Sequence, residues 1–132
     1  MTKRLMLDTN IYDRIVARDG FTARLVRAVR RQQVEILRTP VQDEEIRRIP
    51  DAARRAAMQK VPFRRIPTNE AAWSATTPMP SEDDLIAATA EAAADVLVTE
   101  DRDLSERVTA KGTKLEVWSF DRLVRFIDYL PE

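Results

Sequence analysis

The residues of this sequence best suited to chemistry are acidic side chains that flank its apolar runs. Four of them are spread along the chain, at Asp8, Glu45, Asp83 and Asp101. The first and last follow apolar runs that read as strands, and ligands of open α/β sheets bind beyond the carboxyl ends of parallel strands. Four acids at one rim repel one another unless a divalent cation neutralises them. Oxygen ligands alone favour Mg²⁺ or Mn²⁺, which activates water and stabilises the charge that builds on a phosphodiester.

The composition removes most competing chemistries. The chain has no cysteine, which excludes thiol catalysis and zinc–thiolate sites and fits a reducing cytoplasm. It has no histidine, which excludes Ser-His-Asp triads and imidazole metal ligands. No apolar run approaches the roughly 18–20 residues of a membrane span, and the N-terminus turns acidic before a signal peptide could develop. We therefore expect a cytoplasmic protein, with no membrane partner, whose chemistry depends on carboxylates.

The elements that must position these acids follow from the apolar periodicity. Strands are expected at Lys3–Leu7, Val34–Leu37, Val61–Ile66, Val96–Thr99 and Lys114–Trp118. Helices are expected at Ile11–Arg18, Phe21–Arg31, Pro40 to about Ile49, Ala52–Lys60, Asn69–Ala75, Asp83–Ala94 with Ser81 as its cap, Leu104–Ala110 and Asp121–Leu130. At 132 residues the chain forms one domain, residues 1–132. The alternation predicts an α/β fold with three layers, α/β/α, around a parallel sheet of four to five strands.

Each acid, taken alone, also has a purely structural explanation. Asp8 precedes a helix as an N-cap would, and Asp101 lies between a strand and a helix, where turn residues are common. Asp83 stands in a first helical turn, where the helix dipole favours acids. Glu45 is explained equally well as a surface charge. It is the joint pattern of the four that favours a metal site.

Helical periodicity separates two of these acids from their acidic neighbours. Glu45 shares the apolar stripe of its helix, whereas Glu44 lines up with Arg47 in the pattern of a solvent-side ion pair. Asp83 shares the apolar stripe of the next acidic helix, whereas Asp84 lines up with its polar side. We therefore expect Glu45 and Asp83 to be the metal ligands of the two pairs.

Three segments resemble the PIN-domain family. LMLDTNIYDRI is similar to the family's opening strand and first acid, and VQDEEIRRIPDAARR is similar to its second acidic segment. DDLIAATAEAAADVLVTEDRDL resembles the third and fourth acidic segments and is the most specific of the three. They are spread over nearly the whole chain in the order that the family has. The segment Asn69–Pro80 departs from the family because it is short for the usual helix and loop, which bears on the substrate groove.

The resemblance implies a fold, an activity and partners. It makes Asp8, Glu45, Asp83 and Asp101 the catalytic, metal-binding acids, with Thr99 as a polar site residue and Asn10 as a structural neighbour. The implied activity is a Mg²⁺- or Mn²⁺-dependent endoribonuclease that cuts single-stranded or structured RNA. Such a protein is often the toxin of a VapC-type toxin–antitoxin pair. A homodimer and a cognate antitoxin protein are then the expected partners.

The charges are divided unevenly along the chain, although the net charge is zero. Residues 24–65 hold twelve Arg or Lys against five Asp or Glu, and residues 66–132 hold six against fourteen. Two explanations stay open: solvated arginine faces of helices, or contacts to RNA phosphates. The candidate phosphate contacts are Arg24, Arg27, Arg30, Arg31, Arg47, Arg48, Arg54, Arg55, Arg64 and Arg65.

Three other classes of protein share features with this sequence. A haloacid-dehalogenase-type phosphohydrolase also places an acid after its first strand, but it needs a second Asp where this chain has Asn10. A doubly wound domain with a phosphoacceptor normally has that acid after a later strand. The remaining alternative is a catalytically inactive PIN-fold module that binds RNA or a protein.

Overall fold

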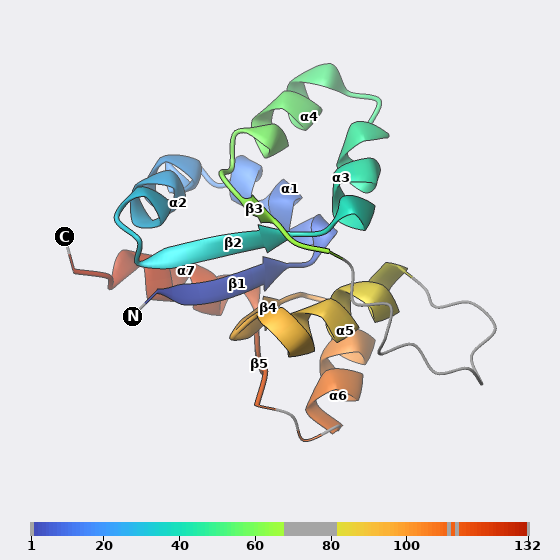
Figure 1. The fold of residues 1–132 in the computed structure, drawn as a ribbon. Coiled ribbons are helices and arrows are strands. Elements are labelled where there is room, and N and C mark those ends of the chain that lie inside the picture. The colour runs from blue at the N-terminus through green and yellow to red at the C-terminus, as the bar shows by residue number, and fades with distance from the viewer. Residues whose placement is uncertain (1, 68–81, 111, 113, 132) are drawn as a thin grey trace.

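The computed structural model describes residues 2–67, 82–110, 112 and 114–131 (Figure 1). The predicted helix Asn69–Ala75, the loop that follows it to Pro80 and the predicted cap Ser81 lie outside the described residues. In the described part, no helix combines the length and apolar character that crossing a membrane requires.

Five strands form one parallel sheet in the order β3-β2-β1-β4-β5. The strands are β1 (Lys3–Leu7), β2 (Val34–Arg38), β3 (Arg64–Arg65), β4 (Val96–Val98) and β5 (Glu116–Trp118). The central strand is β1, whose Leu5 pairs with Ile36 of β2 and with Val96 of β4. The expected α/β fold with a parallel sheet is therefore confirmed.

Both edge strands are shorter than the sequence predicts. β3 pairs only with the last two residues of β2, and Pro62 lacks the N–H that a longer ladder would need. β5 begins at Glu116 because its partner β4 begins at Val96, the residue opposite it. Lys114 and Leu115 were predicted to belong to this strand, but they precede the first paired residue.

Seven helices are described, and they cover both faces of the sheet. They are α1 (Thr9–Ala17), α2 (Phe21–Arg30), α3 (Pro40–Arg47), α4 (Ala52–Gln59), α5 (Glu82–Ala93), α6 (Arg102–Ala110) and α7 (Phe120–Asp128). On one face, Leu5 and Leu7 of β1 pack with α1, α2, α7 and the ends of α3 and α4. On the other face, Met6 packs with α5 and α6. Alternate residues of one strand thus serve two cores, which is the expected three-layer arrangement.

The path of the chain defines a crevice at the carboxyl edge of the sheet. From β1 the chain adds β2 and β3 on one side and then β4 and β5 on the other. The direction of winding therefore reverses between β1 and β4, and ligands of open α/β sheets bind at such a switch point. Asp8 directly follows β1, and Asp101 follows β4 by three residues. The fold brings these two acids to the edge where the sequence predicts a site.

Candidate active site

Asp8 is a buried carboxylate, only 5% exposed, at the carboxyl end of the central strand. Its backbone N–H donates to the carbonyl of Val98 at 2.9 Å, which continues the pairing of β1 with β4. Its Oδ2 accepts a hydrogen bond of 2.8 Å from the hydroxyl of Thr99. Asp8 stands at the N-cap position of α1, yet its side chain makes no capping hydrogen bond. Helix capping therefore does not explain why an acid is buried here.

Thr99 connects Asp8 to Asp101. Its side chain is buried, and its Oγ1 also accepts a hydrogen bond of 3.0 Å from the backbone N–H of Asp101. Oδ1 of Asp101 accepts from the N–H of Leu104 at 3.1 Å, so Asp101 does cap the start of α6. Its Oδ2 has no hydrogen bond to the residues that the structure describes. One hydroxyl thus orients two acidic residues, one of which keeps an oxygen for a ligand.

Asp8 and Asp101 form an acidic pair whose two negative charges are unfavourable together unless a cation is bound. Burial raises the pKa of Asp8, the hydroxyl of Thr99 and the N–H of Thr9 lower it, and the charge of Asp101 raises it again. Within the described part of the chain, neither Asp8 nor Asp101 forms an ion pair with a basic side chain. A positive ion between the two carboxylates would offset both the desolvation and the repulsion.

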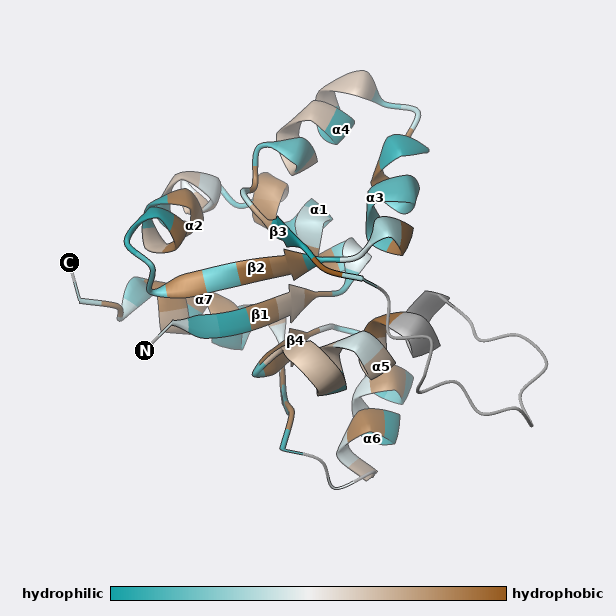
Figure 2. Ribbon diagram, viewed as in Figure 1, coloured by the Kyte–Doolittle hydropathy of each residue, from teal (hydrophilic) through white to brown (hydrophobic). Residues whose placement is uncertain are grey.

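Helix α3 is fixed beside this pair by a polar contact. It is a largely hydrophilic helix next to the hydrophobic β2 (Figure 2), and its wholly buried Gln42 donates from Nε2 to the carbonyl of Leu7. Gln42 also completes a capping box with Thr39, and Pro40 occupies the first turn, as predicted. The sequence signal for Gln42 was the Thr-x-x-Gln spacing of the capping box, but the sequence interpretation did not include it among the site residues.

Glu44 and Glu45 of α3 differ in exposure as predicted, but the difference is smaller than the sequence indicates. Glu44 is exposed and pairs with Arg47 at 3.5 Å, so the predicted solvent-side ion pair is confirmed. Glu45 is half-buried, while the buried side of α3 consists of Gln42, Asp43 and Ile46. Glu45 therefore lies on the flank of the buried face rather than at its centre. It follows Gln42 by three residues, which places it on the same side of the helix.

Asp83 lies in the first turn of α5, but its side chain is outside the described residues. The stripe that was predicted to face the core is buried, with Ile86, Ala87 and Ala90 at most 5% exposed. Among the described side chains, no group of three acids is placed to hold a metal ion. The structure thus brings Asp8 and Asp101 together and does not add Glu45 to them as a third member.

A buried cluster that the sequence interpretation missed lies at the end of β2. Arg38 is 1% exposed, and its guanidinium carbon lies 4.8 Å from the ring centroid of Tyr12 and 3.8 Å from that of Phe63. It pairs with Asp43 at 3.4 Å, and Asp43 also pairs with Arg65. Because two arginines neutralise Asp43, this acid is not available to a metal ion in the way that Asp8 is.

A polar pocket of about 290 Å³ opens beside the acidic pair, along the ends of β4 and β5. Thr99 and Asp101 line it together with Ser105, Glu106 and Ser119. A substrate that reaches Asp101 from this side meets hydroxyl and carboxylate groups, which suit polar ligands.

The fold and the site together define an α/β protein with two neighbouring carboxylates, the buried Asp8 and the half-buried Asp101, at the switch point of a parallel sheet. No protein-family model matches the chain, and no curated protein is found to be related to it.

Proposed function

We propose that this chain is a Mg²⁺- or Mn²⁺-dependent endoribonuclease of the PIN-domain kind. The observation that supports it most is the arrangement of Asp8, Thr99 and Asp101 at the switch point of the sheet. A buried acid with a second acid nearby and no described counter-ion raises the free energy of the folded state. Such groups concentrate at functional sites.

The donor set fits a hard divalent cation. Asp8 and Asp101 offer carboxylate oxygens, and the chain contains neither cysteine nor histidine to favour zinc. In the proposal, these two acids hold the ion, with Glu45 and Asp83 as the further ligands that the PIN resemblance implies. A bound divalent cation supplies positive charge to the phosphodiester under attack and acidifies water.

The chain's own residues keep the acids in position. The hydroxyl of Thr99 holds the carboxylate of Asp8, and the N–H of Leu104 holds that of Asp101. Gln42 ties the start of α3 to the end of β1, so Glu45 is carried toward the same edge. Groups whose orientation is fixed in this way lose little freedom when a substrate binds.

The substrate and the partners in this proposal come from the PIN resemblance. They are RNA, a second copy of the chain in a homodimer and, for a VapC-type toxin, a cognate antitoxin. Light scattering on the purified chain measures whether it forms the homodimer. A monomer at all concentrations would remove the homodimer from the proposal and leave the nuclease in place.

The nuclease itself is tested with a fluorescent single-stranded RNA, incubated with the purified chain in Mg²⁺ or Mn²⁺ and in EDTA. The wild type should cut the RNA only with a metal ion, and Asp8→Asn should not cut it. Cleavage that is equal in EDTA would overturn the metal mechanism. RNA that is bound but never cut would favour the inactive PIN-fold module.

A further inference from the structure

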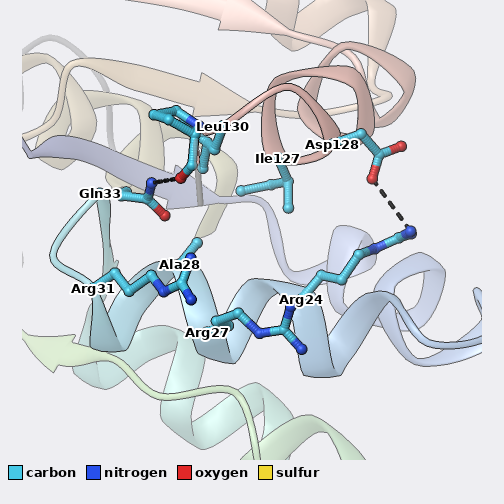
Figure 3. A pocket seen from close by; sticks show the side chains of 9 residues that line it. Arg24, Arg27, Ala28, Arg31, Gln33, Ile127, Asp128 and Leu130 are labelled. Carbon is cyan, nitrogen blue, oxygen red and sulfur yellow. Dashed lines mark hydrogen bonds and ion pairs between the residues drawn. The ribbon is translucent and has the colours of Figure 1, made fainter.

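A second polar pocket lies between α2 and α7, at the edge of the sheet opposite to Asp8. Gln33, which directly precedes β2, lines this pocket, whereas Asp8 follows the end of the parallel strand β1. The pocket has a volume of about 320 Å³ (Figure 3). Its position keeps it separate from the acidic pair and from the pocket beside that pair.

One side of this pocket is lined by Arg24 and Arg27 of α2 and by Arg31, the residue that caps the end of this helix. Arg24, Arg27 and Arg31 are spaced by three and four residues, so they share one stripe of the helix. The apolar side chains of Ala28 and Ile127 also line the pocket. Figure 3 shows the guanidinium groups along α2, with Asp128 of α7 opposite Arg24. The stripe is therefore part of a concave surface rather than a row of side chains on a free helix face.

The positive charge of the pocket is only partly neutralised. Arg24 pairs with Asp128 at 3.4 Å. Within the part of the chain that the structure describes, Arg27 and Arg31 form no ion pair. The described lining residues thus carry three positively charged guanidinium groups and one negatively charged carboxylate. A concave surface lined by charges of one sign attracts and concentrates ions of the other sign.

We propose that this pocket binds a phosphate group, with Arg27 and Arg31 as its ligands. A guanidinium presents a planar fork of N–H donors that matches the oxygens of phosphate, and two adjacent forks suit a group with several acceptor oxygens. The phosphate comes either from free inorganic phosphate or from the backbone of an RNA strand. The site lies away from Asp8, so it is independent of whether the chain cuts RNA.

The same arginines have a structural explanation, because basic residues near the carboxyl end of a helix interact well with its dipole. That explanation requires no phosphate binding. It also predicts no difference between Arg27, Arg31 and Arg30, which is an exposed arginine of the same helix outside the pocket. Arg30 therefore provides a matched control for charge and for helix position.

The experiment titrates the full chain in EDTA with inorganic phosphate by calorimetry and with a single-stranded RNA by fluorescence anisotropy. Arg27→Ala and Arg31→Ala should each weaken phosphate binding about tenfold, because each removes a hydrogen bond to a charged group. Arg30→Ala should change it less than twofold. Asp128→Asn should tighten it, because it removes the only negative charge among the described lining residues.

The RNA arm identifies the source of the phosphate. If an RNA strand is the ligand, the Arg27→Ala, Arg31→Ala double variant should lower the salt slope of RNA binding by about 0.7, the value for one phosphate contact on a single strand, with Arg30→Ala as the control. An unchanged slope together with lost phosphate binding identifies free phosphate. The proposal is overturned if the wild type binds neither probe, or if Arg30→Ala weakens binding as much as the pocket variants do. The four substituted residues, Arg27, Arg30, Arg31 and Asp128, are exposed. Thermal unfolding checks that the variants remain folded.

Discussion

Replacing Thr99 with valine tests whether one buried hydroxyl holds the acidic pair together. Valine has nearly the same shape, so the change removes two hydrogen bonds and leaves no large cavity. The bonds lost are the one donated to Asp8 at 2.8 Å and the one accepted from the N–H of Asp101 at 3.0 Å. The first involves a carboxylate and contributes about 1.5–3 kcal/mol when that group is ionised, and the second contributes about 1 kcal/mol. Thr99 is 4% exposed, so water replaces neither.

The expected loss in the free energy of unfolding is about 2.5–4 kcal/mol, or a fall of about 10 °C in melting temperature for a domain of this size. Urea unfolding in EDTA measures it. The hydroxyl favours the ionised form of Asp8 and lowers its pKa. The loss in the free energy of unfolding caused by Thr99→Val should therefore be largest at a pH where Asp8 is ionised. It should become smaller as the pH falls through the raised pKa of Asp8 toward 3.8.

Thr109→Val, at an exposed threonine of α6, is the matched control and should change stability by less than about 0.5 kcal/mol. The reasoning fails if Thr99→Val costs no more than this control. It also fails if the cost is the same at every pH, because the hydroxyl would then not act on the charge of Asp8.

Three further predictions concern single carboxylates. Because the folded-state pKa of Asp8 is raised, its contribution to stability is present below pH 3.8 and is lost as the pH rises through the folded-state pKa. Asp8→Asn should therefore flatten the pH dependence of the free energy of unfolding over this range, measured by urea unfolding in EDTA. An unchanged pH dependence would refute this. Asp43→Asn should cost about 3–5 kcal/mol in thermal or urea unfolding, because it leaves a buried guanidinium without its charge partner; a loss under about 1 kcal/mol would contradict it. Glu45→Gln and Asp83→Asn should abolish RNA cleavage while Glu44→Gln keeps most of it, and turnover assays that reverse this order would show that the assigned ligands are wrong.

The central part of the fold could be predicted because local patterns and packing agree there. Leu5–Leu7 of β1 and Val96–Val98 of β4 are buried on both faces of the sheet, so these two runs are continuous in apolar residues. Once both are parallel strands, the acids that follow them must share an edge, which is why Asp8 and Asp101 could be paired in advance. The edge strand β3 was predicted too long because its length depends on its neighbour β2 and on Pro62.

The cluster around Arg38 could not be predicted because its parts are distant in sequence. A charged residue at the end of a strand is usually solvated, so nothing in VEILR indicates a buried guanidinium. Its burial depends on the rings of Tyr12 and Phe63 and on the carboxylate of Asp43, which only the tertiary fold assembles. For the same reason, periodicity placed Glu45 on the apolar stripe of α3, although the buried face is centred on Gln42 and Ile46.

The most direct test of the proposed metal site is a calorimetric titration of the chain with Mn²⁺, comparing Asp101→Asn with Asp103→Asn. Asp103 is an exposed acid two residues away in α6, so the two variants lose the same charge in the same region. The wild type and Asp103→Asn should bind Mn²⁺, and at a hundredfold excess over Kd the ion should stabilise both by about 2.7 kcal/mol. Asp101→Asn should lose this binding and this stabilisation. Equal binding by both variants, or none by the wild type, would contradict a metal site formed by Asp8 and Asp101.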